Sequence, residues 1–373
     1  MRDYLHSGNL GLKDKILSLD YKLIFLILLL GIISIFAIYS TERGQFNYYT
    51  QSHLYRFCAF FVIFLIISLI NIQIFYKSAY IFYLLVLILL FGVDFFGVTA
   101  SGSKRWLNLF FLNIQPSELM KIALIIFLAR FYNKIPSHDV NRIRFIFLPI
   151  FIILIPFFLI INQPDLGTAI LVTIGGFAMI WLVGLRMKYF LYSFLALVCL
   201  APIVIAFLKP YQKMRILTFF NPEKDPLGAG YQIIQSKIAI GSGGFFGKGY
   251  LNGSQSYLDY LPEKHTDFIF TLFSEEFGFL GSLSLLLIYG LIIYRIVSIG
   301  TLSRSNFAKL YCYGFAVAFF AYVAVNMSMV LGLLPIVGAP LPIMSYGGSS
   351  MLAMMIGLGL VMICKVHKHV DVA

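Results

Sequence analysis

Ionisable residues gather in one short segment of the sequence, LPEKHTDFIF, which leads into a long apolar run. Within five positions it places Glu263, Lys264, His265, Thr266 and Asp267. Such a cluster offers a carboxylate or an imidazole that could take a proton from a bound substrate. Asp267 is the first candidate for that base, and its alternative is a cap for the helix expected to follow. His265 could be a base as well, or it could support the segment by hydrogen bonding.

Charged residues also lie inside or beside apolar segments elsewhere. Glu118 and Lys121 in PSELMK are three residues apart, so on a helix they share a face and can pair. A charge within a membrane segment is a functional candidate by default, and its alternative is a structural ion pair. Asp165 in NQPDLGTA could instead be a helix cap, and Arg105 in SGSKRWLNL a solvated loop cation. Together these residues suit a phosphate-bearing substrate that must lose a proton.

The elements that must position these residues are membrane helices. Hydrophobic residues make up 60% of the 373 residues, charged residues only 12%, and the mean hydropathy is +0.89, which is far from a soluble domain. Continuous apolar runs favour helices over barrel strands, whose residues alternate. The sequence predicts an all-α polytopic membrane protein, one domain over 1–373, with a bundle of ten transmembrane helices near 22–40, 55–72, 78–97, 116–133, 144–162, 166–184, 188–208, 273–296, 308–331 and 346–364.

The basic residues predict the orientation of this bundle. With the N-terminus in the cytoplasm, inner loops hold sixteen Lys and Arg and the short outer loops only four, Arg43, Arg56, Lys104 and Arg105. Both termini are therefore expected in the cytoplasm. The net charge of +12 is explained by this membrane topology and does not indicate nucleic-acid binding, because the basic residues are scattered over the loops without a nucleic-acid-binding motif. The four cysteines have no paired spacing that suggests disulfides or a metal site.

One connection, about 209–267 between helices seven and eight, is far longer than the others and is expected outside the cytoplasm. Loops of this length tend to be functional or disordered, and its apolar and aromatic residues favour order. Its segment YQIIQSKIAI predicts a short interfacial helix. The Gly-rich GSGGFFGKG matches neither a phosphate-binding loop nor a dinucleotide fingerprint, so tight turns are the better interpretation.

Four segments carry a family resemblance. NQPDLGTA, DPLGAGYQIIQSKIAIGSGG, LPEKHTDFIFTLFSEEFG and GLLPIVGAPLPIMSYGGSS resemble the SEDS family of peptidoglycan polymerases, which act in shape, elongation, division and sporulation. The resemblance extends over nearly the whole chain. KIAIGSGGFFGKG and LPIVGAPLPIMSYGG are closer to the elongation branch of the family than to its division branch.

The resemblance implies a glycosyltransferase that polymerises lipid II, the undecaprenyl-diphosphate-linked disaccharide pentapeptide, at the outer face of the cytoplasmic (inner) membrane. The essential aspartate of the family falls on Asp267, and its cavity residues fall on Lys121 and Asp165, with Arg105 and Glu118 less well matched. Asn162 departs from the residue found in many relatives. The implied partners are a class B penicillin-binding protein, which is a transpeptidase, and the MreB-associated elongation complex.

The chemistry of glycan polymerisation agrees with these residues. A sugar hydroxyl is too weak an acid to attack unaided and needs one base, whereas diphosphate leaves without a general acid but requires positive charge. Asp267 is the expected base or acceptor-positioning group, with Lys121 and Arg105 around the diphosphate or holding Asp267 ionised. A single displacement inverts the anomeric carbon. No cofactor is expected with certainty; a divalent cation could share the diphosphate charge.

Two other functions fit a polytopic bundle. A flippase for lipid-linked precursors should carry charged residues through the middle of the membrane, whereas these residues cluster near the outer end. A non-catalytic scaffold of the wall-synthesis complex would need no convergent acid and base.

Overall fold

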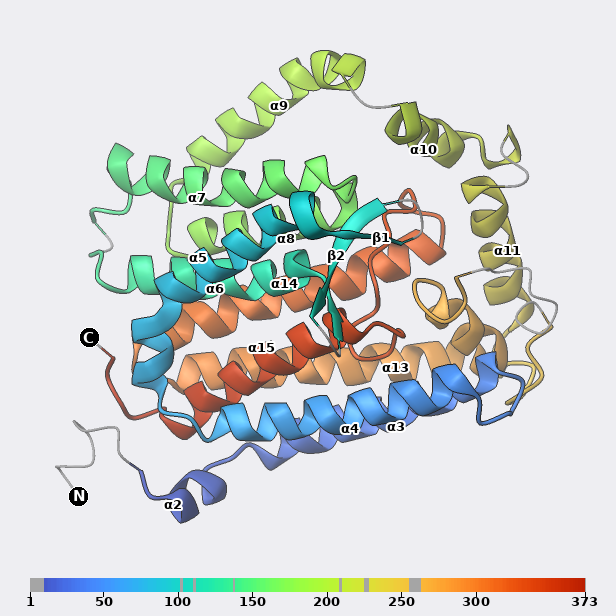
Figure 1. The fold of residues 1–373 in the computed structure, drawn as a ribbon, viewed down its shortest axis with the longest axis horizontal. Coiled ribbons are helices and arrows are strands. Elements are labelled where there is room, and N and C mark those ends of the chain that lie inside the picture. The colour runs from blue at the N-terminus through green and yellow to red at the C-terminus, as the bar shows by residue number, and fades with distance from the viewer. Residues whose placement is uncertain are drawn as a thin grey trace.

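The computed structural model describes residues 10–100, 103–109, 112–136, 138–207, 210–224, 228–254 and 263–372. It is built mainly from helices (Figure 1). Each predicted segment overlaps one long helix: α3 (Tyr21–Thr41), α4 (Tyr48–Ser68), α5 (Ile72–Phe96), α6 (Pro116–Asn133), α7 (Ile143–Asn162), α8 (Leu166–Leu182), α9 (Met187–Phe207), α13 (Ile269–Leu302), α14 (Asn306–Val330) and α15 (Gly348–Val366). A short helix, α2 (Leu12–Leu17), precedes them.

The chain is a multi-pass membrane protein. Within the described residues, seven helices are long and apolar enough to cross a membrane, namely α3, α4, α5, α7, α13, α14 and α15. Of the others, α6 carries three charged residues, Glu118, Lys121 and Arg130, and α8 has only 17 residues. Ten crossings therefore stay a prediction.

The centre of the bundle is formed by α14 and α15, most of whose residues are buried. α15 packs along α4, and α14 contacts α13, α8 and α6. Small residues permit this close packing, as they commonly do between membrane helices. A Cβ at Gly357 of α15, for example, would lie only 2.2 Å from the Phe315 ring of α14. The apolar helices thus pack into one continuous core.

A small antiparallel sheet lies between α5 and α6, so the all-helical prediction was wrong for this connection. Its strands are β1 (Val98–Ala100), β2 (Ser103–Leu109) and β3 (Leu112–Ile114), in the order β1-β2-β3. Thr99 pairs with Lys104, and Asn108 with Asn113. The strands are too short to leave a clear alternating pattern in the sequence. As a result Arg105, expected in a loop, lies on β2.

The long connection contains α10 (Pro210–Phe220), a 3₁₀ turn η1 (Pro222–Lys224) and α11 (Ala229–Ser242). The predicted helix at YQIIQSKIAI is confirmed by α11. The Gly-rich segment that follows forms turns and pairs with α13, since Lys248 N donates to Glu275 O at 3.0 Å and Phe279 N donates to Gly244 O at 2.9 Å. α13 is interrupted at this point by Gly278, whose φ is 63°.

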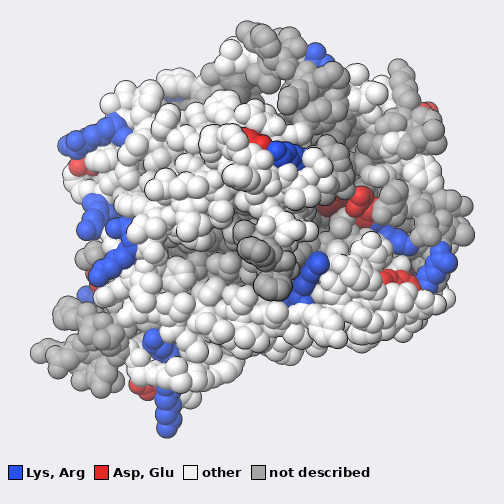
Figure 2. Space-filling model, viewed as in Figure 1, with Lys and Arg blue, Asp and Glu red and all other residues white. Residues whose placement is uncertain are grey.

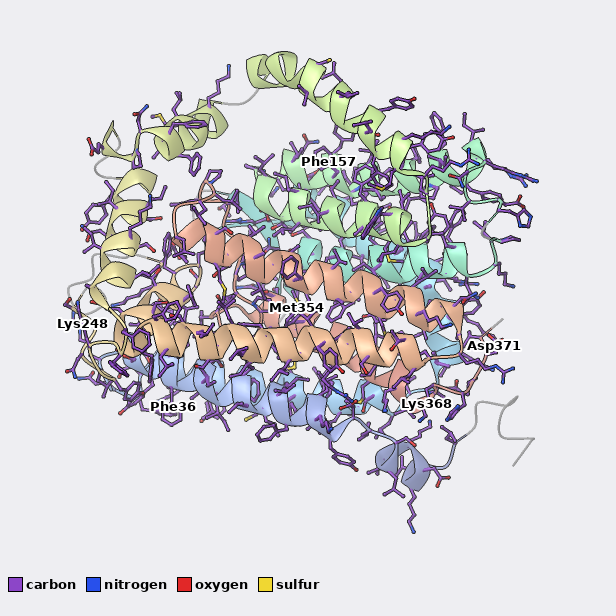
Figure 3. The ribbon with its side chains drawn as sticks, turned by 180° about the vertical axis from the view of Figure 1, so that it is seen from behind. Phe36, Phe157, Lys248, Met354, Lys368 and Asp371 are labelled. Atoms are coloured by element: carbon purple, nitrogen blue, oxygen red, sulfur yellow. The ribbon has the colours of Figure 1, made fainter. Side chains whose placement is uncertain are left out.

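The molecule has two distinct ends. Figure 3 shows Lys248 at one end and Lys368 and Asp371 at the other. In Figure 2, many of the Lys and Arg side chains on the visible face gather at the left end, where both termini lie in Figure 1. The orientation expected from the loop charges would place this end in the cytoplasm.

Candidate functional site

A cavity of about 730 Å³ is lined by elements that lie away from the chain termini in Figure 1, among them β2 and α11. Its walls come from β2, the starts of α6 and α8, α11, the segment just before α13, the loop between α14 and α15, and the first turn of α15. Four of the six predicted site residues line it: Arg105, Glu118, Asp165 and Asp267. Residues more than 150 positions apart in the chain therefore share one site, whose volume is typical of a pocket for a small ligand.

The backbone around Asp267 is held by two polar side chains. The N-cap position of α13 falls on Phe268, so Asp267 lies one residue before it. Asn326, fully buried in α14, donates from Nδ2 to Asp267 O at 2.9 Å and to Ala339 O at 2.6 Å. Ser345 Oγ donates to Thr266 O at 2.7 Å. These bonds leave the Asp267 segment little freedom to move relative to the cavity.

The loop between α14 and α15 closes the space between Asp267 and α8. Gly338 has a φ of +73°, and a Cβ placed there would lie 3.6 Å from Asp267 Oδ2. On the other side of the loop, a Cβ on Gly167 of α8 would lie 2.2 Å from Val337 O. Only glycine permits this close approach and the left-handed conformation at little cost. The loop therefore determines how near Asp267 lies to the N-terminus of α8.

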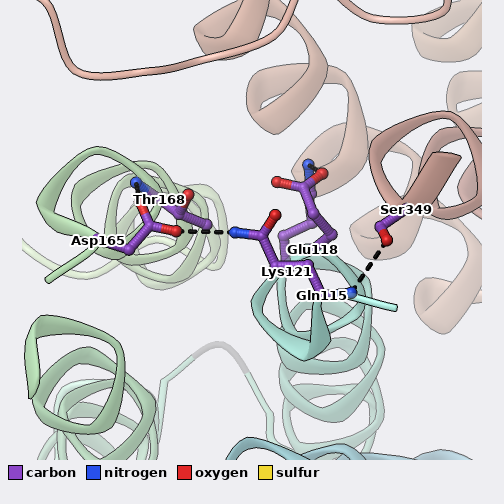
Figure 4. A network of polar contacts seen from close by, with 6 residues as sticks. All are labelled: Gln115, Glu118, Lys121, Asp165, Thr168 and Ser349. Carbon is purple, nitrogen blue, oxygen red and sulfur yellow. Dashed lines mark hydrogen bonds and ion pairs between the residues drawn. The ribbon is translucent and has the colours of Figure 1, made fainter. Parts of the chain in front are cut away.

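Asp165 caps α8 and also lines the cavity, and Figure 4 shows it with its polar neighbours. Its Oδ1 accepts from Thr168 N at 3.3 Å, which confirms the cap interpretation. Its Oδ2 accepts from Gln115 Nε2 at 2.8 Å and lies 3.7 Å from Arg105 Nη1. Burial raises the pKa of Asp165, and the Arg105 charge opposes that rise. The carboxyl group is thus fixed by three partners from three elements.

Glu118 and Lys121 form the ion pair that their spacing predicts. Lys121 Nζ lies 2.6 Å from Glu118 Oε2, and both side chains are buried. The ammonium also lies 3.6 Å from the centre of the Tyr322 ring, a cation–π contact. Glu118 reaches the cavity, whereas Lys121 is not among the residues that line it. In this structure Lys121 therefore pairs with a residue of the cavity wall without lining the cavity itself.

His265 lies beside the site, outside the set of cavity-lining residues. Its Nδ1 is 2.7 Å from Thr41 Oγ1, and its ring stacks on Tyr49 with 4.1 Å between centroids. Its carbonyl oxygen accepts from Tyr346 N at 2.9 Å. These contacts tie the segment before Asp267 to α3, α4 and the α14–α15 loop. These contacts favour hydrogen-bonding support of the segment, rather than proton removal, as the role of His265.

Sequence reasoning missed several polar and aromatic residues of the cavity wall: Trp106, Gln115, Gln232, Tyr346 and Ser350. Gln115 is the N-cap residue of α6, and its backbone N–H donates to Ser349 Oγ at 3.0 Å. The one available signal was a polar residue flanked by apolar ones, which is too common to single out a site. Within the described residues, no group of three or more His, Cys, Asp or Glu could hold a metal ion.

Residues 17–370 match the family model of FtsW, RodA and SpoVE, described as a cell cycle protein. The chain is 40% identical over 360 residues to the Escherichia coli (strain K12) protein named peptidoglycan glycosyltransferase MrdB, and the match covers 95% of each chain. It is also 39% identical over 283 residues to stage V sporulation protein E of Bacillus subtilis (strain 168), covering 75% of both.

Solved structures of similar chains belong to proteins of the same kind. One similar chain, with a TM-score of 0.81 and 31% identity over 94% of this chain and 98% of that one, belongs to a peptidoglycan synthase complex described as coordinating polymerization and crosslinking. Another is the rod shape determining protein RodA of Thermus thermophilus, with a TM-score of 0.68 and 27% identity over 94% and 97% of the two chains.

Proposed function

Because the chain belongs to the FtsW, RodA and SpoVE family of cell cycle proteins, we propose that its cavity is where lipid II is polymerised into glycan strands. The chain is a peptidoglycan glycosyltransferase of the RodA type. The observation that carries the assignment of the site is the convergence of Arg105, Asp165 and Asp267 on one cavity.

Asp267 is the proposed base. It accepts the proton of the acceptor sugar hydroxyl as that oxygen attacks the anomeric carbon of the donor. The bond between the anomeric carbon and the diphosphate oxygen breaks, and its electron pair leaves with the diphosphate. Attack from the face opposite the leaving group inverts the anomeric centre. The pinned backbone of Asp267 supports this role, since a base must stay within hydrogen-bond reach of its proton.

Arg105 is the proposed partner of the diphosphate. It lines the cavity, and its Nε is buried without a hydrogen-bond partner among the described residues. A guanidinium with free donors suits two phosphate oxygens. Asp165, 3.7 Å away, orients this guanidinium, and Gln115 in turn holds Asp165. Lys121 compensates the charge of Glu118 behind the cavity wall. A divalent cation on the diphosphate is compatible with these roles.

The membrane setting is part of the proposal. The cavity opens outside the cytoplasmic (inner) membrane, both termini lie in the cytoplasm, and residues 1–373 form one domain with ten crossings. The sixteen-to-four bias of Lys and Arg supports this orientation. A class B penicillin-binding protein is the proposed partner for cross-linking the strands, since a similar chain belongs to a complex that coordinates polymerization and crosslinking. The MreB-associated elongation complex is proposed from the resemblance to RodA.

A flippase is less well supported. Among the described residues, buried acidic and basic side chains lie toward the ends of the bundle, as Glu118 and Lys121 do at the cavity and Asp20 does beside the partly buried Arg295. A route for a charged headgroup should instead carry polar groups through the middle. A non-catalytic scaffold would not require a carboxylate such as Asp267, held in place in a polar cavity.

The test is strand formation from lipid II by the purified protein, alone and with its transpeptidase. Asp267→Asn should lower the rate of polymerisation by at least roughly 10²-fold, the lower range for losing a general base. The amount of the variant in the membrane and its binding to the transpeptidase should stay as in the wild type. Asp94→Asn is the matched control, since Asp94 lies on α5 and does not line the cavity. Activity of Asp267→Asn within a few-fold of wild type would rule Asp267 out as the base.

A further inference from the structure

Helix α11 of the long outer connection is clamped to the helices behind the cavity. Ser236 is fully buried, and its Oγ donates to Val330 O at 2.7 Å. A hydroxyl has one proton, so the 2.7 Å contact between Ser236 Oγ and Thr271 Oγ1 requires Thr271 to donate. This buried hydroxyl pair joins α11 to both α13 and α14. α11 is therefore a fixed wall of the site.

A second contact fixes α11 along α13. A Cβ placed on Gly243, at the C-cap of α11, would lie 2.3 Å from Ser274 O, so the two backbones approach closely there. Gln232 lies four residues before Ser236, one helical turn away on the same face. Thr271, the partner of Ser236, lies four residues after Asp267. The clamp thus holds Gln232 at the wall of the cavity that Asp267 also lines.

The side chain of Gln232 is only partly buried, and it has no hydrogen-bond partner among the described residues. A carboxamide carries two donors and one acceptor but no charge. It cannot act as the base, and it adds nothing to the positive charge that the diphosphate needs. It does match the hydroxyl and acetamido groups of a sugar, which both donate and accept hydrogen bonds.

We propose that Gln232 is a substrate-positioning residue that hydrogen-bonds a hydroxyl or acetamido group of the sugar reacting at Asp267. This inference rests on the proposed function of the cavity. Through the Ser236–Thr271 clamp, the outer connection supplies part of the sugar site, in addition to covering the bundle.

The experiment measures kcat and KM for lipid II polymerisation by purified Gln232→Leu, with Gln235→Leu as the matched control. Gln235 lies on the same helix and does not line the cavity. Gln232→Leu should lower kcat/KM by about 10-fold to 100-fold, the range for leaving a buried polar partner unsatisfied, and Gln235→Leu should stay within about twofold. The pH profile should not change, because no titrating group is removed.

A binding measurement separates positioning from a structural role. Lipid II should raise the Tm of the wild type by binding the folded state, and Gln232→Leu should reduce that rise without lowering the Tm of the unliganded protein. An unchanged kcat/KM and an unchanged ligand-induced rise would overturn the role of Gln232. If Gln232→Leu fails to accumulate, Gln232→Asn decides by the same two criteria. Wild-type protein that neither binds nor polymerises lipid II would instead overturn the proposed function itself.

Discussion

Two carboxyl groups of the cavity have different surroundings, which separates their roles at the scale of single residues. Asp165 is buried and held by Thr168, Gln115 and Arg105. Asp267 has its backbone held by Asn326, and its side chain lies beside Gly338 at the cavity wall. The Asp165 carboxylate, fixed as a helix cap, is suited to orienting a cation. The Asp267 carboxylate, at the cavity wall, is suited to contacting a substrate. The following variants test that division.

Asp165→Asn and Asp165→Ala should separate the effect of helix capping by Asp165 from the effect of its negative charge. Asn caps helices about as well as Asp, so Asp165→Asn should keep stability within about 1 kcal/mol of the wild type. It should still lower polymerisation, because Arg105 loses the charge that orients it. Asp165→Ala should lose activity and roughly 1 kcal/mol or more of stability. Thermal unfolding and strand synthesis measure the two effects; full activity in Asp165→Asn would leave Asp165 a cap only.

Lys121→Met should be strongly destabilising, because it leaves the Glu118 carboxylate buried without its partner. Removing one member of a buried ion pair typically costs about 3–5 kcal/mol. The double variant Glu118→Met with Lys121→Met should recover much of that stability, because neither charge remains. It should not recover polymerisation, because the cavity loses the Glu118 carboxylate. A double variant with wild-type strand synthesis would show that the pair serves packing alone.

At the scale of elements, the interruption of α13 attaches the long connection between α9 and α13 to the bundle. Around Gly278 the helix exchanges backbone hydrogen bonds with the Gly-rich segment, as in Gly249 N to Glu276 O at 3.0 Å. Lys248 Nζ adds a 2.6 Å contact to the buried Glu275 carboxylate. Burying the Glu275 carboxylate alone would cost free energy, and the charge of the Lys248 ammonium offsets that cost. The segment thereby joins the end of α11 to the helix that begins beside Asp267.

Gly247→Ala tests this attachment. Gly247 has a φ of +84°, and a Cβ there would lie 2.0 Å from Glu276 O. The left-handed conformation costs about 1–2 kcal/mol for other residues, and the overlap adds roughly 1–3 kcal/mol. We expect faster proteolysis of the long connection between α9 and α13, a lower Tm and reduced strand synthesis. Gly241→Ala is the control, because nothing lies within 4 Å of its Cβ position. Equal protease resistance in the two variants would contradict this account.

At the scale of the whole molecule, the two ends of the bundle should face different compartments. In a background without the four native cysteines, His138→Cys and Ser254→Cys place single thiols at exposed positions of opposite ends. An impermeant thiol reagent added to intact spheroplasts should label Ser254→Cys only, and both after the membrane is opened. Labelling of both in intact spheroplasts would refute the proposed orientation and the number of crossings between these positions.

The sequence by itself determined the repeated membrane helices, the helix at YQIIQSKIAI and the pairing of Glu118 with Lys121. Each depends on a property carried by neighbouring residues: apolar length, helical periodicity or a spacing of three. The motif LPEKHTDFIF likewise singled out Asp267, which lines the cavity.

Only the tertiary structure decided how these parts meet. It put Arg105 on a strand beside Asp165, Lys121 behind Glu118, His265 against Tyr49, and Gln232 in the cavity wall. These outcomes depend on packing between segments far apart in the chain, such as the Asn326 bond to Asp267 and the approach of Val337 to Gly167. A local pattern cannot record them, because the same residue types at the same spacing would suit many other arrangements of these helices.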